Sequence, residues 1–347
     1  MLYILMVADS FEESVLEELG RAANYRIIDC QHNLLIADLR MKRGKSLDDA
    51  RFIHSHFPIS RAAALDTKRY LEFIYKQIRA LKISKKAALR IECFDINCKQ
   101  GYSAKDIEVA TGQRLEKDGF NIDIKAPKVL AYVILLNGRC YSGSVRLSRS
   151  RYAYIDPFRT RKERVISRAE FKIIEAFESF GIDAPKVAID IGAAPGGWSL
   201  FLASKGAAVI AIDGAQLDYA GIRKAGVKVD IAKLSGRNAL ARMLKPGGIV
   251  HVKCDLDRAL GHLGGVQADF LGNDINAGSM RSAQAVMKYS RLMKKGATLV
   301  MTVKCMRRNV DKYIGEVKGT LGKGFAITNL KVLPHNRQEI TLLARKR

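Results

Sequence analysis

Four ionisable residues in the C-terminal half of the sequence have the types and positions that proton transfer requires. Asp274, Lys304 and Glu339 each stand where an apolar, strand-like segment ends or begins. Lys172 lies in the first turns of a helix-like segment, off its apolar stripe. A neutral lysine amine can remove a proton from a hydroxyl group, and carboxylates can orient both partners. The four residues are therefore candidates for a catalytic set.

The elements that carry these residues predict that they meet. In a parallel sheet the strand ends that bear Asp274 and Lys304 lie on one edge. The last two strand-like segments, near 326–333 and 340–344, read as an antiparallel hairpin, which brings Glu339 to the same edge. Lys172 can reach that edge from its flanking helix. Each residue alone fits an ordinary solvated or strand-end charge, so the prediction depends on their convergence.

A glycine-rich turn predicts a nucleotide-binding crevice beside this edge. An apolar strand from Val187 ends in Asp190, and a helix follows the turn. Glycine lets the backbone approach a ligand closely, and a helix N-terminus offers free N–H groups. The spacing G-x-x-x-G-G differs from the dinucleotide pattern GxGxxG and from the phosphate-binding pattern GxxxxGK[ST]. The cofactor-binding candidates here are Asp190, Gly192, Ala193, Ala194, Pro195, Gly196, Gly197 and Trp198.

Two further aspartates indicate which ligand the crevice takes. Asp213 ends the next strand, 21 residues after Gly192, where a carboxylate can accept both ribose hydroxyls. Asp255 ends a third strand and is placed to meet an adenine. An adenosyl ligand without a pyrophosphate fits best, which predicts S-adenosylmethionine as the cofactor. Asp274 is a further candidate, since its carboxylate can favour the positive sulfonium of that cofactor. Any one of these aspartates alone could be only a helix cap.

The charge of the chain predicts a polyanionic partner. Fifty-nine Lys and Arg against 35 Asp and Glu give a formal net charge of +24. Ten basic and three acidic residues lie between Arg139 and Lys172, interleaved with tyrosine and phenylalanine. Basic side chains can hold phosphates and aromatic rings can stack on unpaired bases, which favours RNA over a merely basic surface.

Cysteine spacing and hydropathy narrow the class of protein. The six cysteines include no CxxC pair, so no zinc site is predicted, and no other metal site is expected. No apolar run approaches the roughly 20 residues that a membrane helix needs. The opening segment reads as a strand and not as a signal peptide, so a cytoplasmic protein with reduced thiols is expected. The sequence does not predict the oligomeric state.

The N-terminal half predicts two small α+β domains. Residues 1–65 alternate strand-like and helix-like segments, as in a ferredoxin-like domain, and carry no evident chemistry. Residues 66–150 contain RIECFD from Arg90, a helix opened by Ser103, IDIKAP from Ile122, and a hairpin around Asn137 and Gly138. This pattern resembles a THUMP domain, which implies RNA binding; an unrelated α+β domain is the alternative. Residues 151–166 read as a basic linker.

The C-terminal domain, 167–347, resembles a known enzyme family. SRAEFKIIEAF, DIGAAPGGW, NDIN, LVMTVK and HNRQEITLLARKR look like the FtsJ-type RNA 2′-O-methyltransferases. The ending and the THUMP-like region are closest to the bacterial large-subunit rRNA cytidine 2′-O-methyltransferase group. The resemblance implies structured RNA (rRNA or tRNA) as the partner. It implies a doubly wound, Rossmann-like α/β sheet with a C-terminal antiparallel hairpin, after the α+β domains. Its Lys–Asp–Lys–Glu set carries over onto Lys172, Asp274, Lys304 and Glu339.

The resemblance has one departure, and other functions stay open. The family's S-D-x-x-P is here Asn273-Asp274-Ile275-Asn276, without the proline, which leaves the loop shape and the held base unpredicted. A base N-methyltransferase would carry (N/D)PP(Y/F) at this place, and this sequence lacks it. A non-catalytic RNA-binding or assembly factor is a further alternative, against which the presence of all four polar residues argues.

The assignment of Lys304 as general base sets a requirement on its charge. Lowering a lysine pKa from about 10.4 to about 7.5 means roughly 4 kcal/mol against the cation. Desolvation and Lys172 act in that direction, while Asp274 and Glu339 oppose it. Among the other reactive groups, Cys305 should be a buried thiol, since strand alternation turns it away from Lys304. His335 is expected to be a loop histidine.

Overall fold

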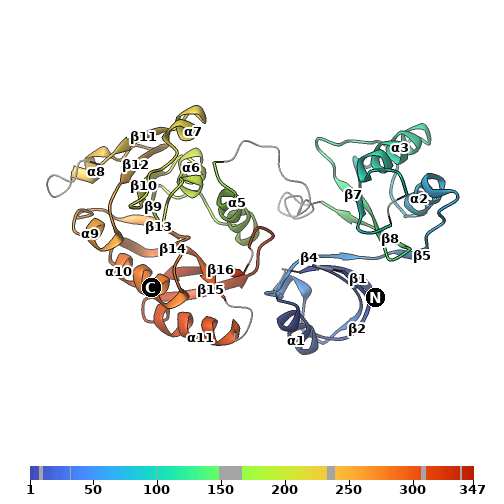
Figure 1. Ribbon diagram of the computed structural model, residues 1–347, viewed down its shortest axis with the longest axis horizontal. Helices are drawn as coiled ribbons and strands as arrows, with labels where there is room; N and C mark the ends of the chain where they lie inside the picture. Colours follow the sequence, from blue (N-terminus) through green and yellow to red (C-terminus); the bar gives the residue numbers. More distant parts are fainter. Residues whose placement is uncertain are drawn as a thin grey trace. The chain divides into compact units, whose positions relative to one another are not determined.

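The computed structural model describes residues 1–7, 11–31, 33–98, 100–147, 166–232, 239–305, 310–336 and 338–347. The chain divides into two compact units, Met1–Asp156 and Pro157–Arg347 (Figure 1). Apart from Ile166, the expected basic linker 151–166 lies outside the described residues. Within the described part, no helix is long and apolar enough to cross a bilayer.

The first unit contains two four-stranded sheets. The first sheet is wholly antiparallel, in the order β2-β3-β1-β4, and carries helix α1. The second has the order β5-β8-β7-β6, in which only β6 and β7 are parallel, and carries helices α2 and α3. The elements are β1 (Leu2–Val7), α1 (Glu12–Ala22), β2 (Ala23–Gln31), β3 (Leu34–Met41), β4 (Ile53–Pro58), β5 (Arg61–Ala64), α2 (Tyr70–Arg79), β6 (Leu89–Asp95), α3 (Ala104–Lys117), β7 (Val129–Leu136) and β8 (Arg139–Arg146).

Strand β7 shows how the two sheets are held together. Its sequence is apolar throughout, and seven of its eight residues are buried. Because side chains alternate across a strand, Ala131, Val133 and Leu135 face α2 and α3, while Leu130 and Tyr132 face the first sheet. Strand β5 pairs with β8, so the chain passes from the first sheet to the second before the expected boundary at residue 65.

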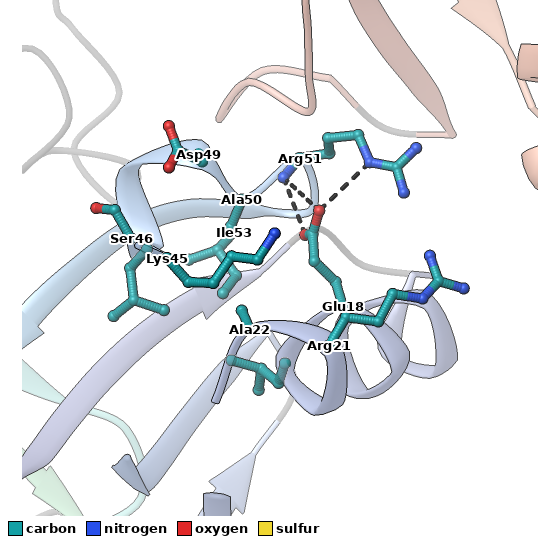
Figure 2. A pocket seen from close by; sticks show the side chains of 11 residues that line it. Glu18, Arg21, Ala22, Lys45, Ser46, Asp49, Ala50, Arg51 and Ile53 are labelled. Atoms are coloured by element: carbon teal, nitrogen blue, oxygen red, sulfur yellow. Dashed lines mark hydrogen bonds and ion pairs between the residues drawn. The ribbon is translucent and has the colours of Figure 1, made fainter. Parts of the chain in front are cut away.

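The carboxylate of Glu18 connects helix α1 to the segment before β4. Glu18 accepts hydrogen bonds from the backbone N–H groups of Arg51 (2.9 Å) and Phe52 (3.0 Å), and from Arg51 Nε (3.3 Å). Figure 2 shows Glu18 in the small pocket that this contact borders, with Lys45 beside it. The pocket holds about 180 Å³, less than the roughly 300–1,000 Å³ of small-molecule sites. Glu18 therefore has a structural role, because its hydrogen bonds hold α1 against the segment before β4.

The second unit is built on one eight-stranded sheet. Its order is β11-β12-β10-β9-β13-β14-β16-β15, parallel except for β16, which runs antiparallel to both neighbours. This is the expected Rossmann-like sheet with its C-terminal antiparallel hairpin. The strands are β9 (Val187–Ile191), β10 (Ala208–Ile212), β11 (Lys228–Ile231), β12 (Gly248–Val252), β13 (Ala268–Asn273), β14 (Met293–Lys304), β15 (Phe325–Lys331) and β16 (Glu339–Lys346).

Helices cover this sheet and fix its central strands. Ile173 and Phe177 of α5 pack with Phe201 of α6 against Ala188 and Phe270 of the sheet. Helices α10 and α11 contact each other and strand β14 (Figure 1). The helices are α5 (Ala169–Phe180), α6 (Gly197–Ser204), α7 (Tyr219–Lys224), α8 (Ala239–Met243), α9 (Leu256–Leu260), α10 (Ser279–Tyr289) and α11 (Val310–Leu321).

The start of α5 differs from the sequence prediction. Ser167 and Glu170 have the S-x-x-E spacing that predicts a capping box, but the helix begins at Ala169 and Arg168 makes no side-chain cap. Glu170 instead accepts the N–H of Ile166 at 3.3 Å. The reason is packing, since a Cβ on Gly197 would lie 2.8 Å from Ser167 Oγ. Ser167 is thus held against the first turn of α6 and not over the end of its own helix.

Candidate active site

The glycine-rich turn after β9 is shaped by its contact with the loop that carries Asp274. Gly192 has φ +75°, and a Cβ added to it would lie 2.9 Å from the Cα of Ile275. Only glycine accepts both this backbone conformation and this approach without strain. The turn therefore brings the ends of β9 and β13 into direct contact, as the neighbouring strands of a parallel sheet require.

A cavity of about 690 Å³ opens beside this turn, and we call it the glycine-turn cavity. Five of the predicted cofactor residues line it: Gly192, Ala194, Asp213, Asp255 and Asp274. Its volume suits a small-molecule ligand. Asp255 also caps α9, accepting the N–H of Arg258 at 2.9 Å. The sequence prediction had left a cap as the alternative role, and the structure gives Asp255 both positions.

Asp213 is fixed in place by the backbone around it. Its carboxylate accepts the N–H of Ala194 at 3.0 Å and the N–H of Ala215 at 2.8 Å. Buried His251 lies beneath, with Nε2 3.2 Å from the Asp213 carbonyl oxygen and Nδ1 2.6 Å from the Tyr219 hydroxyl. Burial lowers the pKa of His251, so its ring is neutral and can donate to one partner while accepting from the other. The sequence alone does not reveal this support, because a histidine within the apolar strand β12 resembles a core residue.

The other predicted cofactor residues do not line the cavity. Asp190 is 1% exposed, accepts the Ser199 hydroxyl at 2.6 Å, and has its pKa raised by burial to about 7. Trp198 packs in the core, and its indole N–H donates to the Ala169 carbonyl at 2.8 Å. These residues shape the turn from behind. The remaining ones, which form the turn without lining the cavity, are Ala193, Pro195, Gly196 and Gly197.

The four candidate catalytic side chains come together in one ion-paired cluster. Lys304 Nζ lies 2.9 Å from Asp274 Oδ1, and Lys172 Nζ lies 3.2 Å from Asp274 Oδ2. Glu339 pairs with both lysines, one through each carboxylate oxygen. Each carboxylate thus contacts each amine. We call this set the lysine–carboxylate cluster.

Strand register explains the convergence. Strand β13 pairs in parallel with β14, so Asp274 and Lys304 follow neighbouring strands at one sheet edge. Because β16 runs antiparallel, its first residue, Glu339, lies directly opposite Lys304, the last residue of β14. Lys172 arrives from α5, which packs on the sheet beside them. The cluster is therefore a product of the sheet topology.

Burial and opposite charge act against each other in the cluster. Burial by itself favours a neutral Asp274, but Lys304 and Lys172 outweigh it and hold the Asp274 pKa below its usual value. Burial likewise favours a neutral Lys304 amine, but Asp274 and Glu339 outweigh it and raise the Lys304 pKa. The lowered Lys304 pKa that a general base requires is thus absent from the resting site. Lys304 is an ammonium group at neutral pH.

Three neighbouring side chains that the sequence analysis missed hold the cluster in place. The buried amide of Asn273 donates to the Ser282 hydroxyl at 2.9 Å and accepts the Ile275 N–H at 3.1 Å. These bonds shape the loop that lacks the family's proline. The Thr302 hydroxyl donates to Asp274 Oδ1 at 2.6 Å. Strand alternation could have revealed Thr302, since residues 302 and 304 share a face.

A second cavity, of about 970 Å³, lies on the other side of the cluster. We call it the lysine cavity. Lys172, Lys304 and Glu339 line it, and Asn276 and Ala277 line both cavities. The two cavities therefore meet at the cluster and the Asp274 loop. The remaining lining residues are Arg168, Ala169, Gly278, Ser279, Cys305, Tyr313, His335 and Gln338.

Cys305 and His335 both line the lysine cavity. Cys305 is 4% exposed, as expected, although it forms part of the lysine-cavity wall. Burial raises the pKa of its thiol to about 12, which makes it a poor nucleophile. His335 lies in the loop between β15 and β16, as expected. This loop residue is held against α5 through Glu175 and Phe171.

The sheet, the glycine-rich turn and the paired carboxylates define an S-adenosylmethionine-dependent methyltransferase domain. Comparison with known families agrees, because residues 165–328 match the FtsJ-like methyltransferases.

Individual relatives match about half of the chain. A "Ribosomal RNA large subunit methyltransferase E" from Neorickettsia sennetsu is 28% identical over 199 residues, covering 51% of this chain and 79% of its own. An uncharacterized protein from Methanocaldococcus jannaschii is 24% identical over 197 residues, covering 53% of this chain and 48% of its own. Among solved structures, TrmN from Thermus thermophilus aligns over the whole of both chains with a TM-score of 0.42 and 16% identity.

The residues that line the glycine-turn cavity fit S-adenosylmethionine, the cofactor of this domain. The backbone of Gly192 leaves open the space that a Cβ would otherwise fill beside the Asp274 loop. Asp213 and Asp255 supply the acceptors that ribose hydroxyls and an adenine amine require. Asp274, held ionised by two lysines, supplies negative charge where the cavity reaches the cluster.

Proposed function

We propose that this protein transfers a methyl group from S-adenosylmethionine to a ribose 2′-hydroxyl of RNA. The observation that carries the proposal is the position of the lysine–carboxylate cluster between two cavities. The glycine-turn cavity on one side has acceptors for an adenosyl ligand. The lysine cavity on the other is larger, and the exposed Arg168 at its border suits an anionic acceptor. A group bound there would present its hydroxyl to the cluster.

Charge and relatives support RNA as the acceptor. The net charge of +24 favours a polyanion through counterion release. The Neorickettsia relative is named for the methylation of large-subunit ribosomal RNA. In this proposal the first unit, with its THUMP-like segment 66–150, contributes RNA binding, and ribosomal or transfer RNA is the substrate class.

The residues of the cluster would each have a defined task. S-adenosylmethionine supplies an electrophilic methyl group when it is bound. Asp274 and Glu339 hold the two amines at fixed positions, so the ribose hydroxyl meets a preorganised set of donors and acceptors. Lys304 is proposed as the group that removes the hydroxyl proton. Its raised pKa means that this requires the minor fraction of molecules with a neutral amine.

Methyl incorporation into RNA tests the proposal directly. Purified protein, tritiated S-adenosylmethionine and ribosomal or transfer RNA should give labelled product, with the label on the ribose after nucleoside analysis. Lys304→Ala should lower turnover by at least about 10³-fold, because general-base removal typically costs 10²–10⁴-fold and positioning is lost with it. The affinity for S-adenosylhomocysteine should stay within a few-fold, since Lys304 does not line the glycine-turn cavity.

The chain offers a matched control on the same strand. Lys295→Ala removes an exposed lysine near the opposite end of β14 and should leave turnover unchanged. Label on a base would refute ribose methylation. Binding of RNA without any incorporation would favour the assembly-factor alternative. Full activity of Lys304→Ala would remove Lys304 from the mechanism.

A further inference from the structure

His335 is held in the wall of the lysine cavity by three separate contacts. Its ring stacks on Phe171, with the centroids 4.6 Å apart and the planes at 28°. Its Nδ1 pairs with one oxygen of Glu175, and its backbone N–H donates to the other oxygen at 3.0 Å. Phe171 and Glu175 are four residues apart in α5 and so lie on the same face of the helix.

The loop that carries His335 is also fixed. Asn336 is buried, and its side-chain oxygen accepts the Leu333 N–H at 2.7 Å and the Thr341 hydroxyl at 2.9 Å. The Asn336 N–H donates back to the Leu333 carbonyl at 2.8 Å. The turn between β15 and β16 is thus closed around one amide. The position of His335 is set before any ligand arrives.

The ring is partly exposed and lines the lysine cavity. Phe171 beneath it is buried and does not line the lysine cavity, whereas His335 does, with a side chain that is 25% exposed. One face of the imidazole lies on Phe171 and its Nδ1 edge lies on Glu175. The surface left for a ligand is therefore the opposite face and the remaining edge of a rigid aromatic ring.

We propose that His335 is a stacking platform for an unpaired nucleobase of the acceptor RNA, with Glu175 as its positioning residue. This inference rests on the proposed function and deepens it. A ribose hydroxyl at the cluster brings its base, or a neighbouring base, into the same cavity. Arg168, which is exposed in the cavity wall, can meet an adjoining phosphate. Stacking on a histidine ring is sequence-tolerant and contributes a typical affinity change of about 5–150-fold per base.

Matched double variants isolate the ring from its hydrogen bond. Glu175→Gln removes the carboxylate partner in both members, and His335→Phe or His335→Ala then retains or removes an aromatic ring. The KM for RNA should be about tenfold higher for Glu175→Gln/His335→Ala than for Glu175→Gln/His335→Phe. The Kd for S-adenosylhomocysteine and the melting temperature should agree between the two, which a purely structural role would not give.

A binding measurement keeps the inference separate from the methylation proposal. The fluorescence of a single-stranded oligoribonucleotide that contains 2-aminopurine should be quenched by the wild-type protein and by Glu175→Gln/His335→Phe. Glu175→Gln/His335→Ala should quench it less. Equal KM values and equal quenching for the Phe and Ala variants would overturn the platform. So would full activity of His335→Gln, which keeps a hydrogen-bonding group without a ring. Methylation of a base in place of a ribose would refute the proposed function while leaving this comparison intact.

Discussion

At the scale of single residues, the state of Lys304 is decided by the balance of charge around it. The Lys304 side chain is 27% exposed, and two carboxylates contact its amine. Their attraction outweighs desolvation and raises the Lys304 pKa. Lysine residues serve as bases when desolvation wins, so this site must work with a small neutral fraction.

The pH dependence of turnover follows from that balance. If Lys304 removes the proton, kcat should rise about tenfold per pH unit from pH 7 to about pH 9.5, because the neutral fraction grows in that proportion below the pKa. A raised Lys304 pKa contributes stability that is present below the unfolded value of about 10.4 and is lost only as pH rises through the folded value. The cluster thus stays intact over the measured range, which circular dichroism would check. A plateau below pH 8 would move the proton acceptor to a carboxylate.

At the scale of elements, the contact between the glycine-rich turn and the Asp274 loop couples the two cavities. Gly192→Ala places a methyl group 2.9 Å from the Ile275 Cα, at a residue with φ +75°. The loop must shift to accept it. We expect the affinity for S-adenosylhomocysteine to fall at least tenfold by calorimetry, and turnover to fall with it.

Gly206→Ala provides the control for backbone strain. Gly206 follows α6 with φ +91°, and a Cβ there would meet nothing within 4 Å. Both variants carry the cost of a left-handed alanine, about 1–2 kcal/mol in thermal unfolding. Only Gly192→Ala should also change ligand affinity. Equal ligand affinity in the two variants would show that the turn does not control the cavity.

At the scale of the whole molecule, the excess of basic residues sets the response to salt. With six to ten phosphate contacts, RNA affinity should fall roughly 10³–10⁵-fold between 50 and 200 mM salt. Filter binding or fluorescence anisotropy across that range measures the slope. S-adenosylhomocysteine binding in the same buffers should change little, because its cavity includes Asp213, Asp255 and Asp274 and needs no phosphate contact. An RNA affinity that does not change with salt would contradict the prediction of a polyanionic partner.

The sequence alone determined the domain type and the identity of the cluster. Apolar strands that end in Asp274 and Lys304, and the antiparallel return to Glu339, follow from local patterns and from the rules of parallel sheets. The spacing of the glycine-rich turn indicated an adenosyl ligand. These features are local in the chain, so they can be read without coordinates.

Only the tertiary structure decided how charge and contact are distributed within the site. Desolvation and ion pairing at Lys304 depend on Asp274 and Glu339, which are far from it in the sequence. Their attraction outweighs burial, so the Lys304 pKa is raised and not lowered as a general base would require. Asp190 and Trp198 belong to the recognisable motif, yet both side chains are buried behind the turn. The Glu175–His335 contact joins residues 160 positions apart. No local pattern encodes such a pair, because packing between α5 and the last hairpin creates it.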